Sequence, residues 1–313
     1  MANLKAIRTR ITSFKSTRQI TSAMKMVSAA KLRKAQDKIV RLRPYANKLH
    51  ELLVDLSLSL SDSEVENIYG RVSPPEKVLI VVITSNRGLC GAFNTNVINE
   101  TRRVISEKYP EQLRKGTLQL LTIGRKGFDY FRKQKIPMLP EQNNLFNNLT
   151  FENVTLVTEQ IMNSFTSLEF DRVELIYNQF KNAAVQNLTN EVFLPVETVP
   201  SVKVKTNPVD YIYEPDQEEI IKELIPKSLK IQFYKAVLDS FVAEHGARMT
   251  AMHKATDNAT SLIRDMTLQY NKARQAAITN QILEVVSGGQ AEEQTGKKNN
   301  RVDIPRKKKS GDR

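Results

Sequence analysis

The sequence predicts an α/β protein in which the N- and C-terminal helices form a long antiparallel coiled coil and the segment between them folds as an α/β domain. Two observations indicate the coiled coil: each end of the 313-residue chain carries an apolar stripe with steps of three and four residues. Side chains at that spacing return to one helix face, so the stripes can pair. A third observation, apolar runs that alternate with helical segments in the middle, is typical of a mostly parallel sheet.

The N-terminal stripe keeps its register over residues 1–60, which we expect to form one coiled-coil helix. Its apolar members are Leu4, Ile7, Ile11, Phe14, Leu32, Ala35, Ile39, Leu42, Ala46, Leu49, Leu53, Leu56 and Leu60. Between the two apolar runs the same face turns polar, at Arg18, Thr21, Lys25 and Ser28. Pro44 lacks a backbone donor and crowds the preceding turn, so we expect a kink or a restart of the helix there.

The C-terminal stripe predicts a second coiled-coil helix over residues 217–288. Its frame is Leu238, Phe241, His245, Arg248, Met252, Ala255, Ala259, Leu262, Met266, Gln269, Ala273 and Ala276. Small residues recur along this frame, so a partner helix could approach closely. Gly246 costs about 1 kcal/mol relative to Ala inside a helix, which the long flanking segments could absorb.

The middle of the chain predicts a Rossmann-like α/β domain over residues 77–198, with linkers at 61–76 and 199–216. Its first segment, residues 77–83, is a continuous β-branched run typical of a strand buried on both faces. Helical and strand segments then alternate at about 95–108, 118–123, 125–133, 152–165 and 172–177. This order is the pattern of a mostly parallel sheet with helices on its faces.

Positive charge is concentrated at the two ends of the chain. Residues 1–43 hold twelve Lys and Arg against Asp37 alone, and residues 297–313 hold eight against two acids, within a total net charge of +13. The segment between them is mildly acidic. This asymmetry implies an acidic partner surface, which nucleic acid, anionic lipid or protein carboxylates could supply. Residues 289–313 read as a basic, polar tail that we expect to be disordered.

Several functional classes lack support. No long uncharged apolar run exists, which argues against a transmembrane span or a secretory signal. The single Cys90 excludes an internal disulfide framework and fits a reducing compartment, and the three histidines show no metal-ligand spacing. Gly88 and Gly91 follow the first strand but match no phosphate-loop pattern. We therefore expect no cofactor, no metal and no catalytic residue in this chain.

Three blocks near the chain ends carry a family resemblance. One is Ile20–Gln36, where the apolar face turns polar; the others are Ala247–Ala259 and Tyr270–Thr279. Together with residues 5–11 and Ser85–Asn94, these motifs resemble the gamma subunit of the rotary (F-type) ATP synthase. The resemblance runs from Leu4 to about Gly288, in the order of that family.

The resemblance implies a rotor that is itself non-catalytic. In that family the coiled coil stands inside a ring of alpha and beta subunits, while the α/β domain lies beside the epsilon subunit and the membrane c-ring. Proton flow turns the shaft, which drives the beta-subunit sites through ATP synthesis or hydrolysis. We therefore expect neither nucleic acid nor a direct small-molecule substrate as a partner. The implied location is peripheral, on the cytoplasmic face of a bacterial inner membrane.

The resemblance also implies a set of contacts with the beta subunits: Met24, Lys25, Lys31, Arg248, Gln275 and Thr279. The basic residues around Met24 would face acidic segments of those subunits, although Met24 itself suits core packing equally well. Arg248 falls on the apolar seam, where an unpaired charge is costly, so it needs a specific acceptor. On this basis Arg248→Ala or Gln275→Ala should impair coupled turnover more than the stability of the free subunit.

Two alternatives come from other functional classes. A coiled-coil adaptor for DNA or RNA would account for the basic ends and the pI of 9.6, but few aromatic residues accompany the basic ones and no nucleic-acid module is legible. Its binding would weaken steeply with salt. A nucleotide-dependent enzyme built on the α/β domain would need a phosphate loop that the sequence lacks, and tight binding of labelled ATP to the isolated chain would favour it.

Overall fold

The computed structural model describes residues 4–59, 68–71, 73–196 and 217–299. The predicted linker 199–216 and residues 61–67 of the predicted linker 61–76 lie outside the described residues, as do residues 300–313 of the predicted tail. The chain divides into two compact units, one of residues 21–254 and one that joins residues 1–20 to residues 255–313.

The larger unit contains a four-stranded sheet with the order β2-β1-β3-β4. The strands are β1 (Val78–Ile83), β2 (Leu118–Ile123), β3 (Arg172–Phe180) and β4 (Gln186–Leu194). Strand β1 runs parallel to both β2 and β3, whereas β4 returns antiparallel to β3 through a hairpin. The mostly parallel sheet that the sequence predicted is therefore confirmed.

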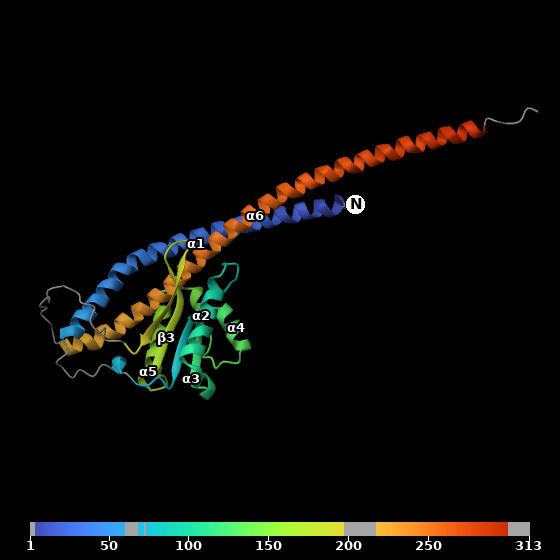
Figure 1. The fold of residues 1–313 in the computed structure, drawn as a ribbon. Coiled ribbons are helices and arrows are strands. Elements are labelled where there is room, and N and C mark those ends of the chain that lie inside the picture. Colours follow the sequence, from blue (N-terminus) through green and yellow to red (C-terminus); the bar gives the residue numbers. More distant parts are fainter. Residues whose placement is uncertain (1–3, 60–67, 72, 197–216, 300–313) are drawn as a thin grey trace, which may run out of the picture. The chain divides into compact units, whose positions relative to one another are not determined.

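Helices cover both faces of this sheet, as its buried central strand requires (Figure 1). Side chains of β1 alternate between the two faces. Val78, Ile80 and Val82 pack with α2 (Phe93–Lys108) and α4 (Arg125–Lys133). The opposite face packs with α5 (Phe151–Thr166) and with part of α6 (Gln217–Asn299). A short helix, α3 (Pro110–Lys115), leads from α2 into β2.

The long helices pair in this unit. Helix α1 (Leu4–Ser59) places Leu32 and Ala35 against Val242 of α6. The pairing is antiparallel, because Arg43 bonds to Asp239 while the earlier Lys31 acts electrostatically on the later Glu244. Helix α1 is continuous across Pro44, so of the two predicted outcomes, a kink or a restart, the restart is excluded.

In the smaller unit, the apolar stripe of α1 is half-buried at each of its predicted positions, which are Leu4, Ile7, Ile11 and Phe14. The seam of α6 differs from the predicted frame. It is formed by Ala259, Ile263, Met266, Tyr270, Ala273 and Ala277. The predicted members Leu262, Gln269 and Ala276 are exposed instead. Steps of three and four residues can be taken in either order from one starting residue, and here the four-residue step comes first after Ala259.

Helix α6 also extends further than predicted. It continues to Asn299, so residues 289–299 are helical where the sequence indicated a disordered tail. Each residue added to an existing helix gains one backbone hydrogen bond, and this segment contains the good helix formers Ala291, Glu292 and Glu293. Among the described helices, none combines the length and the apolar character needed to cross a membrane.

Candidate functional site

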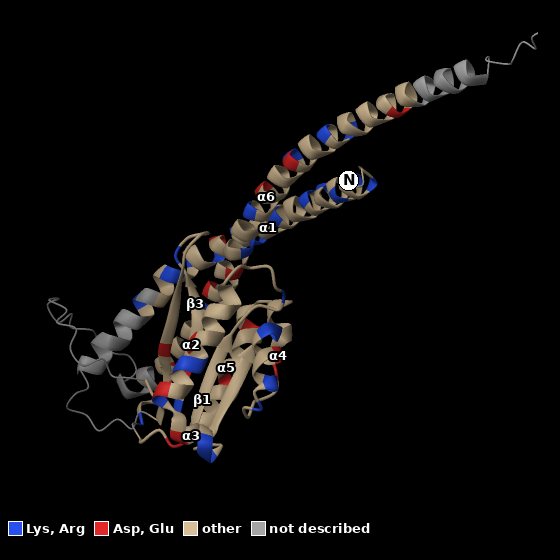
Figure 2. Cartoon of the chain, turned by 45° about the vertical axis from the view of Figure 1, so that its right-hand side comes forward, with Lys and Arg blue, Asp and Glu red and all other residues tan. Residues whose placement is uncertain are grey.

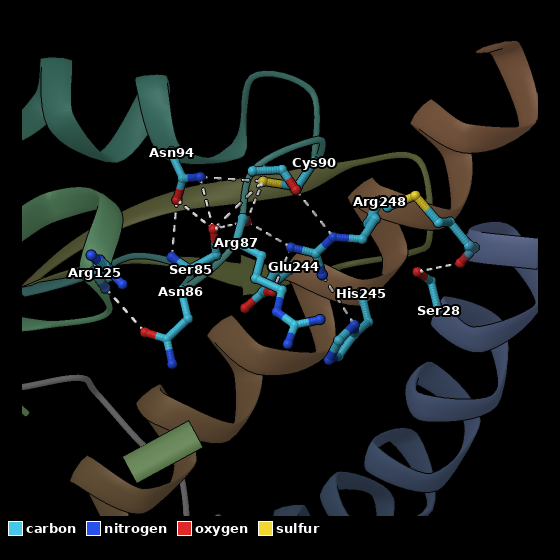
Figure 3. Close-up of polar contacts among 12 residues, drawn as sticks. Ser28, Ser85, Asn86, Arg87, Cys90, Asn94, Arg125, Glu244, His245 and Arg248 are labelled. Carbon is cyan, nitrogen blue, oxygen red and sulfur yellow. Dashed lines mark hydrogen bonds and ion pairs between the residues drawn. The ribbon is translucent and has the colours of Figure 1, made fainter. Parts of the chain in front are cut away.

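The loop that follows β1 is held in one conformation by its own polar side chains (Figure 3). Asn94, at the start of α2, accepts a hydrogen bond from the Ser85 amide at 2.9 Å and donates to the Ser85 hydroxyl at 2.8 Å. That hydroxyl in turn donates to the Arg87 carbonyl at 2.7 Å. The loop therefore presents its carbonyl groups at the carboxyl end of β1, where open α/β sheets commonly bind ligands.

In this protein a side chain of α6 donates hydrogen bonds to those carbonyl groups. Arg248 donates from Nη2 to the Arg87 oxygen at 2.8 Å and from Nε to the Gly88 oxygen at 3.3 Å. The same guanidinium forms an ion pair with Glu244, one helical turn earlier, at 2.7 Å between Nη2 and Oε1. Both side chains of this pair are 8% exposed. The acceptor that the sequence predicted for Arg248 thus exists, and it lies within the same chain.

His245 completes the buried polar group. Its Nδ1 lies 3.3 Å from Arg248 Nη1, and its ring meets Phe241 edge-on at 4.5 Å between centroids. Burial, together with the charges of Arg248 and Lys31, lowers the pKa of His245 to about 3. Burial raises the pKa of Glu244, and Arg248 opposes that effect. At neutral pH the histidine is uncharged and accepts a hydrogen bond from the arginine.

His245 is therefore expected to remain neutral through the range in which exposed histidines titrate. Its folded pKa of about 3 lies below the ordinary value of 6.5, so its contribution to stability is complete above pH 6.5 and falls as the pH drops toward 3. An NMR titration of the imidazole should show no midpoint near 6.5. Between pH 3 and 6.5 the free energy of unfolding should depend less on pH in His245→Gln than in the unsubstituted chain. A titration midpoint near 6.5 for His245 would contradict its neutral, buried state.

A second contact joins α6 to the β3–β4 hairpin. Thr250 donates its hydroxyl proton to the Ala183 carbonyl at 3.0 Å. A Cβ atom on Gly246 would lie 3.2 Å from the Ala183 Cα, so glycine permits this close approach. The sequence presented Gly246 only as a tolerable helix defect, whereas the structure gives it a packing role.

Together these contacts form a joint, which we call the Arg248 joint: Glu244, His245, Gly246, Arg248 and Thr250 on α6, with Arg87, Gly88 and Ala183 on the domain. The polar groups at its centre are satisfied within the chain, apart from His245 Nε2. Cys90 lies beside it, buried, and burial raises the pKa of its thiol. Such an arrangement fastens a helix to a sheet.

The other predicted contact residues are not part of the joint, although the charge of Lys31 acts on Glu244 and His245. Met24 and Lys25 are half-buried and Lys31 is exposed, all on α1 in the larger unit. Gln275 and Thr279 are exposed on α6 in the smaller unit, where Thr279 donates to the Gln275 carbonyl at 3.0 Å. Sequence reasoning missed Glu244 and His245. The spacing of Glu244 to Arg248 by four residues on one helix was a usable signal for the ion pair.

Among the described residues, no group of three His, Cys, Asp or Glu side chains is arranged to hold a metal ion. Comparison with known proteins is more informative. A family model described as ATP synthase matches residues 3–291. The ATP synthase gamma chain of Flavobacterium johnsoniae is 55% identical over 291 residues, and that of Flavobacterium psychrophilum is 54% identical over 292; each alignment covers 93% of this chain and 99% of the relative. The chain belongs to the ATP synthase gamma chain family.

A solved structure supports the same fold. The matching chain in the Euglena gracilis mitochondrial ATP synthase, from an assembly described as OSCP/F1/c-ring, aligns with a TM-score of 0.63. The alignment covers 98% of this chain and 99% of that chain, at 22% identity. Membership in the family confirms the resemblance seen in the sequence. The Arg248 joint then becomes the place where a gamma-type α/β domain is attached to its long helix.

Proposed function

We propose that this chain is the central rotor shaft of an ATP synthase. It couples proton flow across a membrane to the conformational cycle of the beta-subunit catalytic sites, and it is non-catalytic itself. In this proposal residues 1–60 and 217–288 are the shaft helices and residues 77–198 form the α/β domain. The observation that carries it is the alignment with ATP synthase gamma chains along almost the whole chain.

The course of α6 supports a mechanical role. One uninterrupted helix includes both the residues buried against the sheet, such as Phe233 and Val237, and the exposed residues beyond Ala259. A rotation imposed on the domain is therefore carried along α6 by continuous backbone and not by a flexible linker. Each beta subunit then meets a different face of the shaft, and rotation shifts its population between open and closed states through differential contacts.

Charge makes the two shaft helices different from each other. Residues 4–20 of α1 carry five basic side chains and no acid, namely Lys5, Arg8, Arg10, Lys15 and Arg18. Residues 255–287 of α6 carry both signs, as the mixed colours of that helix in Figure 2 show. An asymmetric shaft is what a rotor needs to impose different states on chemically identical neighbours.

The proposed partners are the alpha and beta subunits of the head, the epsilon subunit and the membrane c-ring. Their assignment rests on the family and on the names of the relatives, which come from bacteria. We place the chain on the cytoplasmic face of a bacterial inner membrane, as a peripheral part of the complex.

The proposed beta-subunit contacts are Met24, Lys25, Lys31, Gln275 and Thr279, with Arg248 in a different role. The exposure of Lys31, Gln275 and Thr279 supports direct contact. Arg248 is 7% exposed and already bound to the Arg87 and Gly88 carbonyls, so we propose that it acts by holding the exposed Arg87 in place.

Reconstitution tests the proposal. The chain is co-expressed with alpha and beta subunits of a closely related bacterium, the complex is purified, and its ATP hydrolysis is measured. We expect a stable complex whose activity depends on this chain. If the chain neither joins the alpha and beta subunits nor alters their hydrolysis, the proposal is wrong. Salt-sensitive binding of nucleic acid in place of assembly would favour the adaptor alternative.

Gln275→Ala is expected to lower coupled ATP turnover in the assembled complex by roughly fivefold, because a lost contact of about 1 kcal/mol changes a state population by that factor. The free subunit should keep its stability, since an exposed helix position tolerates Ala well. Gln160→Ala, at an exposed position on α5, is the matched control and should leave both quantities unchanged. Equal turnover in both variants would remove Gln275 from the contact set.

A further inference from the structure

A second polar joint lies where α1, α6 and β3 meet. Arg43 of α1 donates from Nη2 to the Phe180 carbonyl, at the end of β3, at 3.3 Å and to Asp239 Oδ1 of α6 at 3.4 Å. The Asp239 side chain is fully buried, whereas that of Arg43 is 42% exposed. One guanidinium therefore ties together three elements that are far apart in the sequence.

The surroundings of Asp239 are unfavourable for a charge. Glu191 of β4 is a second carboxylate close enough to act on it, and Tyr177 of β3 lies 3.5 Å from Glu191, between Oη and Oε2. Burial raises the pKa of both carboxyl groups, and the nearby cations Arg43 and Lys235 do not fully offset it at Asp239. The second oxygen of Asp239, Oδ2, has no hydrogen-bond partner among the described residues.

On this balance the Asp239 carboxylate is not expected to stabilise the folded chain. A buried ion pair commonly costs more in lost hydration than its attraction returns, and here one oxygen also stays unsatisfied. A carboxylate that does not stabilise the fold, at a point where three elements meet, is explained if it positions those elements relative to one another.

The apolar contacts near Arg43 and Asp239 fix the position of α1 less sharply. Leu32 and Ala35 pack against Val242, and Ile39 belongs to the main core. Hydrophobic attraction is non-directional, so it prefers no single contact direction between the helices. A charge-assisted hydrogen bond has a preferred direction and length, so it selects one arrangement.

We propose that Arg43 and Asp239 form a clasp that holds α1 in one orientation against α6 and the end of β3, and that coupling depends on this orientation. The inference rests on the proposed rotor function. Torque applied to the α/β domain reaches α6 directly through the Arg248 joint, whereas α1 follows through the clasp. Without the clasp α1 can adopt several orientations relative to α6. The shaft then presents no single surface to its neighbours.

The test uses the complete complex in inverted membrane vesicles, in which ATP hydrolysis and ATP-driven proton uptake are both measured. The variants are Arg43→Ala and Asp239→Asn, and the thermal stability of each free chain is recorded. Arg43→Lys keeps a cation in reach of both acceptors and serves as the conservative variant. Arg41→Ala removes an exposed cation from the same helix turn and is the matched control.

We expect Arg43→Ala and Asp239→Asn to lower proton uptake per ATP hydrolysed by roughly fivefold, the factor that about 1 kcal/mol makes in an equilibrium. The melting temperature of Asp239→Asn should stay equal or rise, because the buried charge is gone. Arg43→Lys should recover most of the coupling, and Arg41→Ala should match the unsubstituted chain.

Two results would overturn the clasp. One is normal coupling in both variants; the other is a coupling loss that follows a lower melting temperature and is not recovered by Arg43→Lys, which would indicate a merely structural pair. In either case the unsubstituted chain still assembles and couples, so the rotor function stands. If the unsubstituted chain itself fails to support hydrolysis and proton uptake, the rotor function fails and the clasp fails with it.

Discussion

Arg248→Ala is expected to lower the free energy of unfolding by about 3–5 kcal/mol, the usual cost of removing one partner from a buried ion pair. Glu244 would be left buried without its cation, and the Arg87 and Gly88 carbonyls would lose their donor. Because the loss falls on folding, we expect stability to suffer more than turnover, which is the opposite of the expectation drawn from the sequence.

Urea denaturation of the free chain, followed by circular dichroism, measures this effect. The control is Arg125→Ala, which removes the same side-chain type from a pair in which Asp129 lies 3.7 Å away and Arg125 is 71% exposed. An exposed pair four residues apart contributes only about 0.3–0.5 kcal/mol, so the control should unfold almost as the unsubstituted chain does. If the two variants were equally stable, the Arg248 joint would not hold the helix to the sheet.

Gly124→Ala is expected to prevent the α/β domain from folding. Gly124 follows β2 with a φ of +107°, and a Cβ atom there would lie 2.0 Å from the Thr84 carbonyl oxygen. The obstacle is backbone of the neighbouring strand end, which cannot move aside as a flexible side chain could. A penalty above about 4–5 kcal/mol would consume much of the stability of an ordinary domain.

The observable is the yield of soluble, protease-resistant protein. Gly116→Ala is the matched control, since Gly116 also has a positive φ, +73°, but has open space around the added Cβ. That substitution should cost only about 1–2 kcal/mol, the price of a left-handed conformation for an L-residue. Equal yields of both variants would show that the contact between the ends of β1 and β2 is less tight than the structure indicates.

The sequence predicted the parts of this fold that depend on local pattern. Residues 77–83 and 118–123 were recognisable as strands because β-branched and other apolar side chains predominate in them. Strand β4, Gln186–Leu194, was missed, since an edge strand with Asn187 and Asn190 lacks both a continuous apolar run and a clear alternation.

The site was predictable only in part, for a physical reason. The cost of burying Arg248 indicated that an acceptor must exist, but its acceptors include carbonyl groups about 160 residues away in sequence, which no local pattern reveals. Asp239 was equally hidden, because it lies among apolar residues of α6 and meets Arg43 only after the fold has formed. The residues that form the α6 seam beyond Ala259 also had to be read from the structure. Steps of three and four residues can alternate in either order there, and the sequence pattern is compatible with both orders.

The proposed rotor function requires this chain to turn within a catalytic ring. The most direct measurement immobilises a complex of this chain with alpha and beta subunits and follows a probe attached to Asn163→Cys, an exposed position on α5 of the α/β domain. If the chain is a rotor, we expect ATP-driven rotation of the probe in one direction, which stops when ATP is withdrawn. ATP hydrolysis by the same complexes with a stationary probe would contradict it.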